Sequence, residues 1–254
     1  MPRWARFAHA GTVGFGTLEG EELRVFGGDL FASPQPTGRL LQRADVTLLR
    51  PVEPSKVIVM YNNYAALIEK MQLRTPAEPQ YFLKAPNTYL DPGAVIRKPS
   101  YKSRVVFEGE LGVVIGRHCK DVAEAEAMSC VFGYTCANDV TAADVLTRDP
   151  SFAHWARAKG FDGSLPFGPV IATGLDPRSL VVRTAVDGSV RQSYPVADMI
   201  FELPRLVSLL SQDMSLRPGD LILCGTSLGV GVMKPGSVVE IEIDGIGKLS
   251  NRFE

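Results

Sequence analysis

The chain has 254 residues, a formal net charge of −1 and a hydrophobic content of 45%. This length allows one large core or a main domain with a small attachment, and the near-zero charge argues against nucleic acid or an anionic membrane as the main partner. No apolar run approaches the ~20 residues that cross a bilayer, and the N-terminus lacks the apolar region of a secretory signal. The composition predicts a soluble, cytoplasmic protein without a nucleic-acid or membrane partner.

Residues 1–52 are predicted to form a small N-terminal β-rich domain. Short apolar stretches at residues 12–16 and 22–26 flank a glycine turn, and residues 33–38 are rich in the proline and glycine typical of loops. The proline-rich residues 51–54 mark the boundary, so the second domain is expected to cover residues 53–254.

Strands are predicted to dominate residues 53–254. Residues 239–244 alternate apolar and acidic side chains, residues 221–224 are apolar, and residues 181–186 run into Asp187-Gly188, a preferred pair for a tight hairpin. Helices are expected only over residues 121–131 and 204–211. The predicted fold class is therefore α/β and β-dominated.

The cysteines show no C-x-x-C pairing, which argues against a disulfide framework. They are expected to be reduced, buried thiols of a cytoplasmic protein. They are Cys119, Cys130, Cys136 and Cys224.

Glu108 and Glu110 stand two residues apart in front of an apolar run, so on a strand both carboxylates point to the same side. A solvated strand face would explain such a pair, but Asp139 at the end of another predicted strand offers a third carboxylate. Three carboxylates around a hard cation leave room for waters or a chelating substrate.

Other loops suggest anion binding rather than nucleotide or hydrolytic chemistry. Residues 225–231 follow a strand but lack the phosphate-loop spacing, so Gly225 amides and the Thr226 hydroxyl are expected to hold an anionic substrate group. Lys159 lies in a glycine-rich segment, where it is either solvated or turned inward to stabilise negative charge. The three histidines lack zinc-motif spacing, and no G-x-S-x-G occurs.

Over roughly residues 55–254 the chain resembles the fumarylacetoacetate hydrolase superfamily, in the branch of fumarylpyruvate hydrolases, heptadienedioate isomerases and oxaloacetate decarboxylases. The resemblance implies a mixed β-roll catalytic domain that forms a homodimer. It rests on eight motifs in order, which are residues 63–64, 82–88, 108–111, 133–139, 159–162, 168–169, 218–220 and 225–226.

The resemblance also implies the site. Mg²⁺ or Mn²⁺, with Ca²⁺ as a possible occupant, would be held by Glu108, Glu110 and Asp139, and the substrate would be a small 2-oxo or diketo acid that chelates the metal. Lys159 would stabilise the developing enolate, and Lys84, Gly225, Thr226 and His154 would contact the substrate.

The chain departs from the family pattern where hydrolytic members carry a His-Glu pair, N-Y-x-x-H-x-x-E. Leu67 stands at the histidine position and Lys70 at the glutamate position, while Glu69 is one residue out of register. Three interpretations stay open. In the first, the protein breaks a C–C bond by decarboxylation, or by hydrolysis with another base, which would be metal-bound hydroxide, His154 or Glu69. Alternatively, it is an isomerase in which Tyr64, Lys70 or Lys159 moves a proton, or it binds metal and oxo acid without turnover.

Overall fold

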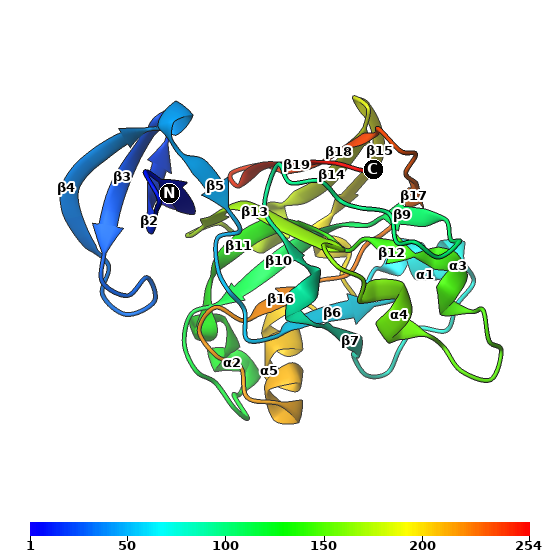
Figure 1. Cartoon of the computed structure of the whole chain (residues 1–254). Helices are drawn as coiled ribbons and strands as arrows, with labels where there is room; N and C mark the ends of the chain where they lie inside the picture. The colour runs from blue at the N-terminus through cyan, green and yellow to red at the C-terminus, as the bar shows by residue number, and fades with distance from the viewer.

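A computed structural model describes residues 1–254, and strands dominate it as predicted (Figure 1). The strands are β1 (Arg3–His9), β2 (Thr12–Glu19), β3 (Glu22–Gly27), β4 (Gln35–Gln42), β5 (Thr47–Leu49), β6 (Val57–Tyr61), β7 (Gln80–Lys84), β8 (Tyr89–Leu90), β9 (Val105–Phe107), β10 (Gly109–Ile115), β11 (Val131–Asn138), β12 (Thr141–Ala142), β13 (Leu165–Ala172), β14 (Val181–Val186), β15 (Ser189–Pro195), β16 (Leu221–Leu223), β17 (Gly231–Val232), β18 (Val238–Ile243) and β19 (Gly247–Arg252). The α-helices are α1 (Ala65–Lys70), α2 (Glu124–Ala127), α3 (Ala143–Leu146), α4 (Trp155–Lys159) and α5 (Leu203–Asp213), and the 3-10 turns are η1 (Arg43–Asp45), η2 (Pro86–Thr88), η3 (Met128–Cys130), η4 (Pro177–Ser179) and η5 (Val196–Asp198).

The strands form three sheets. The largest has the order β4-β3-β2-β1-β13-β11-β10-β16-β6-β7, with β5 added to β1 and β8 to β13. Its pairings are antiparallel except for β16 with β6 and β13 with β8. A second sheet has the order β15-β14-β18-β19, and a third, small sheet has the order β12-β9-β17.

The core lies on both faces of the central strand β10, all of whose residues are buried. On one face Leu111 and Val113 share a cluster with Ile241 and Leu249 of the second sheet. On the other face Val114 packs in a separate cluster with residues of β6 and β16. Burial on both faces holds β10 rigidly, and therefore also fixes the position of the residues at its start.

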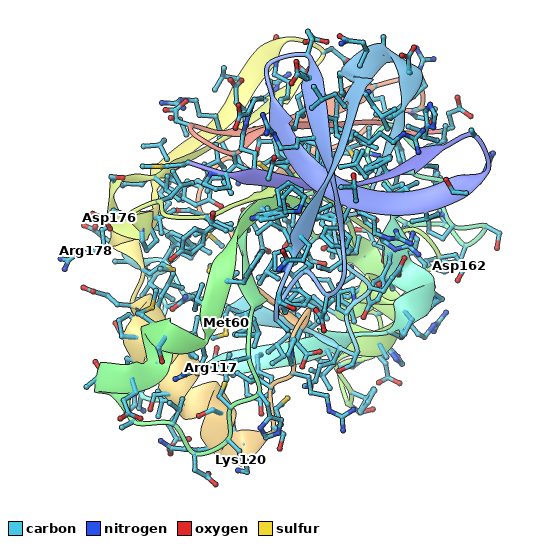
Figure 2. All side chains as sticks on the ribbon, turned by 90° about the vertical axis from the view of Figure 1, so that its left-hand side faces the viewer. Met60, Arg117, Lys120, Asp162, Asp176 and Arg178 are labelled. Carbon is cyan, nitrogen blue, oxygen red and sulfur yellow. The ribbon has the colours of Figure 1, made fainter.

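The strands β1–β5 form an N-terminal unit that projects from one end of the large sheet (Figure 1). The link is a short antiparallel pairing of β1 with β13, through Arg3 with Ala172 and Trp4 with Ile171. Figure 2 views the molecule from this side, with the N-terminal strands in front of the larger sheet. The unit therefore extends the sheet but lies away from the β10–β11 strand ends.

The predicted helix over residues 204–211 is confirmed and is slightly longer, as α5. Its apolar face, with Leu206, Val207 and Leu210, is buried. The ammonium of Lys120 donates to the Gln212 carbonyl at 2.6 Å, near the C-terminal end of α5, where a cation is favourable (Figure 2).

The predicted helix over residues 121–131 is wrong in its length. Asp121 has a φ of 52°, which is outside the helical region, and no side chain caps the first turn. Only α2 and the following η3 form, and Val131 already belongs to β11. The segment packs against α5, so tertiary contact rather than helix propensity defines its extent.

Two other predictions are confirmed. Asp187 and Gly188 both have positive φ, 51° and 76°, and connect β14 to β15 as a tight hairpin turn. All four cysteines are buried free thiols. None of the helices is long and apolar enough to cross a membrane.

Candidate active site

Three carboxylates meet where β10 begins and β11 ends. Glu108 immediately precedes β10, Glu110 is its second residue, and Asp139 follows β11. The two strands pair Gly109 with Asn138, which brings the carboxylates together, and one oxygen of each lies within 4.8 Å of the others. Two hydrogen bonds hold this arrangement: Asp139 N–H donates to the Glu108 backbone carbonyl at 2.9 Å, and Glu108 N–H donates to the side-chain Oδ1 of Asn138 at 2.9 Å.

Gly109, between the two glutamates, is held on both sides of its peptide unit. Its N–H donates to Gln192 Oε1 at 3.0 Å, and its carbonyl accepts from Thr226 Oγ1 at 3.0 Å and from the Tyr194 hydroxyl. A Cβ at this position would lie 2.0 Å from Thr184 Oγ1. Glycine is required here because the second sheet approaches the backbone closely.

We expect Gly109→Ala to destabilise the fold by about 1–3 kcal/mol, the usual cost of overpacking, and to weaken metal binding because both glutamates must shift. Urea unfolding and calorimetric Mn²⁺ titration measure the two effects. Gly27→Ala is the matched control, since its added Cβ would meet only Thr37 Cγ2 at an ordinary 3.7 Å. Unchanged stability and metal affinity in Gly109→Ala would contradict this account.

Two lysines enter the cluster from other elements. Lys159, at the end of α4, places Nζ 2.7 Å from Glu108 Oε2 and 2.5 Å from Asp139 Oδ2. Lys84, at the end of β7, is fully buried, with Nζ 2.7 Å from Asp139 Oδ1 and 3.0 Å from the Ser164 carbonyl. With every group ionised, the three carboxylates and two ammonium groups carry a formal charge of −1.

The charges are unevenly balanced within the cluster. Burial acts to raise the pKa of Asp139, but Lys159 and Lys84 outweigh it and hold that pKa below its usual value. Burial acts to lower the pKa of Lys159, but Asp139 and Glu108 raise it above its usual value. Burial, followed by the neighbouring Asp139 and Glu108, raises the pKa of Glu110 well above its usual value.

Glu110 is the carboxylate of the cluster that no lysine contacts. Its Oε2 accepts only the Gly225 N–H, at 2.7 Å. A cation beside Glu110 and within reach of the other two carboxylates would relieve this repulsion. Since the donors are all carboxylate oxygens, the residues present fit a hard dication such as Mg²⁺, Mn²⁺ or Ca²⁺.

A cavity of about 200 Å³ reaches the cluster at Glu108 and Lys159, whereas Glu110 and Asp139 are not among its lining residues. Glu108 and Lys159 are the charged residues in its wall, and Thr226 is a neighbouring polar one. The remaining lining residues come from β6, α1 with the turn after it, β7 and the loop after β16, and they are Met60, Tyr61, Asn62, Leu67, Met71, Leu73, Phe82 and Val230.

Of the residues that the sequence suggested for substrate contact, some line the cavity and others do not. Thr226 lines the cavity, but its hydroxyl also accepts from Gln192 Nε2 at 2.8 Å. Gly225 has a φ of 88°, and its amide already serves Glu110. Lys84 lies behind Asp139 and does not reach the cavity wall. Because this hydroxyl already donates its one proton to the Gly109 carbonyl, donation to an anionic substrate group would require that bond to be exchanged, and substrate contact by Thr226 stays a prediction.

The candidate proton carriers Tyr64, Glu69 and His154 do not line the cavity. Tyr64 is fully buried, its hydroxyl has no hydrogen-bond partner, and its ring packs edge-on against Tyr194. Glu69 is exposed on α1. The ring of His154 packs against Phe152, with centroids 5.3 Å apart. Their roles stay predictions, and none has direct access to the cavity in this arrangement.

The supporting roles of three residues were not predicted from the sequence. Gln192, on β15, bridges Gly109 and Thr226, and it comes from a strand more than 80 positions beyond Gly109. Thr141 donates to Glu108 Oε1 at 2.6 Å, and Asn138 holds the Glu108 amide. Only Asn138 was signalled, by its place next to Asp139.

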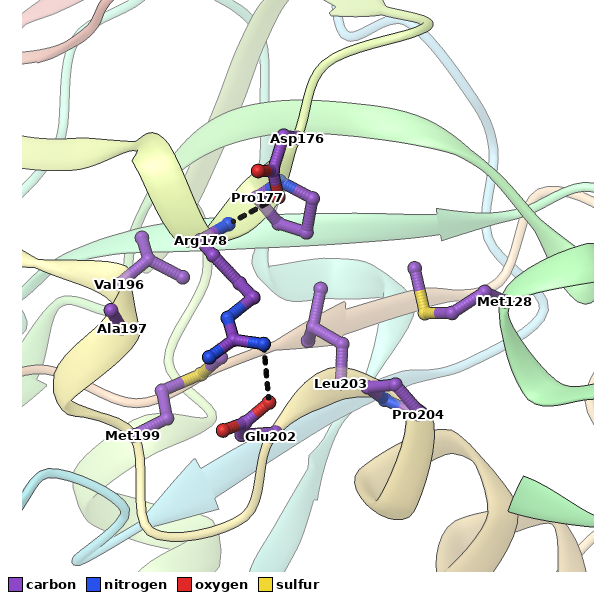
Figure 3. Close-up of a pocket in the computed structure, with 10 residues that line it drawn as sticks. All are labelled: Met128, Asp176, Pro177, Arg178, Val196, Ala197, Met199, Glu202, Leu203 and Pro204. Carbon is purple, nitrogen blue, oxygen red and sulfur yellow. Dashed lines mark hydrogen bonds and ion pairs between the residues drawn. The ribbon is translucent and has the colours of Figure 1, made fainter. Parts of the chain in front are cut away.

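A second cavity, of about 220 Å³, is lined by Met128, Asp176, Pro177, Arg178, Val196, Ala197, Met199, Glu202, Leu203 and Pro204 (Figure 3). Its charged rim holds Arg178, 3.9 Å from Glu202, and Asp176, which accepts the Arg178 N–H at 3.0 Å. It shares no lining residue with the first cavity and has no carboxylate cluster. The first cavity is therefore the candidate active site.

Comparison with known proteins identifies the family of the chain. Residues 56–254 match the family described as fumarylacetoacetate (FAA) hydrolase C-terminal, and residues 3–51 match the family described as Rv2993c-like, N-terminal. The chain therefore belongs to the fumarylacetoacetate hydrolase family, which confirms the resemblance and the β-dominated fold with a small N-terminal attachment.

Three proteins similar to this chain have names that include an activity. The structure of a 2-hydroxyhepta-2,4-diene-1,7-dioate isomerase from Mycobacterium marinum has a TM-score of 0.91 and 41% identity, covering 100% of this chain and 98% of that one. The 4-hydroxyphenylacetate degradation bifunctional isomerase/decarboxylase of Salmonella dublin is 40% identical over 194 residues, 75% of this chain and 45% of that protein. A maleylpyruvate hydrolase from Sphingobium sp. SYK-6, solved with manganese(II) and pyruvate, has a TM-score of 0.82 and 26% identity, covering 99% and 98%.

Proposed function

We propose that this protein is a divalent-metal-dependent enzyme that decarboxylates a small 2-oxo acid. The observation that carries the proposal is the cluster of Glu108, Glu110 and Asp139, with the Lys159 ammonium in contact with two of them, beside a largely apolar cavity that Glu108 and Lys159 line. Manganese(II) and pyruvate in the related maleylpyruvate hydrolase support both the metal and the 2-oxo acid.

Glu108, Glu110 and Asp139 would hold Mg²⁺ or Mn²⁺. The bound dication supplies a Lewis acid for the oxygens of the substrate's 2-oxo acid group. Glu108 is held for this task by Thr141 and Lys159, and Glu110 by the Gly225 amide. These contacts keep the carboxylates in place before metal and substrate arrive.

Lys159 supplies fixed positive charge. Decarboxylation of an oxaloacetate-type acid breaks the C3–C4 bond, releases CO₂, leaves the electron pair on C3 as an enolate and ends when C3 takes up one proton. Because its two carboxylate partners raise the pKa of Lys159 against the effect of burial, the ammonium stays protonated and stabilises negative charge rather than acting as a base.

Hydrolysis is less well supported because the cavity offers no free general base. Leu67 lines the cavity, whereas Glu69 and His154 do not. Attack by water requires a base to take its proton, while loss of CO₂ requires only a sink for the electron pair. The hydrocarbon wall at Leu67 therefore favours decarboxylation over hydrolysis.

An isomerase is the second candidate. The name of the M. marinum relative favours it, the name of the S. dublin relative includes both reactions, and a proton shift next to the oxo group uses the same electron sink. It would additionally require a group that moves the proton, and Lys159 and Tyr61 are the titratable lining residues besides Glu108. A homodimer and a cytoplasmic location, expected from the resemblance and from the reduced cysteines, complete the proposal.

Oxaloacetate with Mg²⁺ or Mn²⁺ tests the reaction. We expect metal-dependent CO₂ release above the metal-only background, abolished by a chelator. Exchange of the C3 protons in D₂O without CO₂ release would favour the isomerase. If the 2-oxo acid binds in the presence of metal but neither reaction exceeds background for oxaloacetate, acylpyruvates or hydroxydienedioates, the protein binds without turnover and the proposal fails.

A further inference from the structure

Besides Glu108 and Lys159, the cavity is lined mainly by apolar side chains, with Asn62 and Thr226 as its uncharged polar residues. Leu67, Met71 and Leu73 approach it from α1 and the turn that follows, and Val230 approaches it from the loop after β16. A 2-oxo acid whose head group lies at Glu108 and Lys159 would direct the rest of its carbon skeleton toward this wall.

Two aromatic rings in the wall, Tyr61 and Phe82, are held by contacts with Trp155. Tyr61 packs edge-on against Trp155, with ring centroids 4.8 Å apart. Phe82 stacks on the same indole at 5.2 Å, and the Lys159 ammonium lies 5.2 Å from the Phe82 ring centre. Fixed aromatic faces offer good contact to alkyl or aryl groups and little to a carboxylate.

The lining contains no cation that is free to pair with a second carboxylate. Lys159 is the only basic residue in it, and its ammonium already contacts Glu108 and Asp139. Lys70 and Arg74 are exposed and lie outside the lining. A carboxylate placed against this wall would lose its hydration without gaining a charge partner, which is unfavourable.

The mouth of the cavity exposes large apolar side chains. Met71 is 59% exposed, Leu73 43% and Val230 41%. Contiguous exposed apolar residues around a cavity are typical of a surface that a ligand covers, because covering them removes apolar area from water.

We propose that the tail of the substrate, the part beyond the 2-oxo acid group and any carboxylate that leaves as CO₂, is uncharged and apolar, either alkyl or aryl. Acids with a further, distal carboxylate are poor ligands. This inference rests on the proposed function, since it takes the head group to bind at the carboxylate cluster.

Calorimetry of the full-length protein with Mg²⁺ tests the tail with a matched pair of ligands. 5-Methyl-2-oxohexanoate and 2-oxoglutarate share the 2-oxo acid head and two methylenes, and they differ in an isopropyl group against a carboxylate of similar shape. Neither has a carboxylate on C3, so neither can lose CO₂ by the proposed reaction. We expect the apolar acid to bind at least about tenfold more tightly.

A charge placed at the mouth should reverse this preference. In Leu73→Arg the guanidinium can pair with a distal carboxylate, so the binding ratio should shift by about tenfold toward 2-oxoglutarate. Leu40→Arg is the matched control, since Leu40 is similarly exposed, at 51%, but lies on β4 of the N-terminal unit. Its binding ratio should equal that of the unmodified protein.

Pyruvate, which has the head without a tail, separates the two ways in which the inference can fail. If pyruvate binds in a metal-dependent way but 2-oxoglutarate binds as tightly as 5-methyl-2-oxohexanoate, or more tightly, the apolar tail is wrong and the proposed function stands. If neither pyruvate nor either longer acid binds to the metal-loaded protein, the proposed function is overturned and the inference with it.

Discussion

Glu110→Ala is expected to abolish metal binding and activity together. Glu110 is fully buried and has no cationic partner, so a dication is the group that would balance its charge. Loss of an outer-shell partner alone typically costs 10–100-fold in metal affinity or activity, so loss of a direct ligand should cost more than about 100-fold in both. Calorimetric Mn²⁺ titration and CO₂ release from oxaloacetate measure the two effects.

Glu110→Gln should give the same losses while keeping the side-chain shape and the hydrogen bond from Gly225. Normal thermal unfolding of this variant would separate loss of the metal from loss of the fold. Glu242→Ala, on a half-exposed residue of β18, is the control and should leave both measurements unchanged. Activity that survives in Glu110→Ala after treatment with a chelator would refute the metal-dependent mechanism.

Lys159→Met should lower turnover by about 100–1,000-fold, the range seen when one stabilising donor of a developing oxyanion is removed. Metal binding should persist because the three carboxylates remain. The side chain of Lys159 is 6% exposed and that of its partner Asp139 is fully buried. Removing one member of such a buried pair costs about 3–5 kcal/mol, so the metal-free variant should unfold at a lower temperature.

Added Mg²⁺ should then raise the unfolding temperature of Lys159→Met by more than that of the unmodified protein, since the ion replaces the lost positive charge. This difference distinguishes a charge-balancing lysine from one that only packs. Lys56→Met is the matched control: it breaks another lysine–aspartate pair, with the buried Asp220, away from the cavity. Lys56→Met should lower the stability of the protein without lowering the turnover number of the folded enzyme. An unchanged turnover number in Lys159→Met would instead show that Lys159 has no part in the mechanism.

Local sequence patterns correctly predicted those parts of the fold that depend only on residues close together in the sequence. Alternation of apolar and acidic side chains predicted β18, and Asp187-Gly188 predicted the hairpin, because strand periodicity and left-handed turn residues are properties of a few consecutive positions. The predicted length of the helix over residues 121–131 was wrong because this short segment takes its conformation from packing on α5 rather than from its own helix propensity.

The sequence by itself determined the family and the three carboxylates, because the spacing of Glu108 and Glu110 is local and the motifs keep their order. The tertiary structure decided what surrounds them. It paired Lys159 with two carboxylates, left Glu110 without a cation, brought Gln192 onto Gly109, and turned Leu67 into the cavity while leaving Glu69 outside. The physical reason is that these contacts join residues far apart in the chain, and strand pairing and sheet packing alone decide which of them meet.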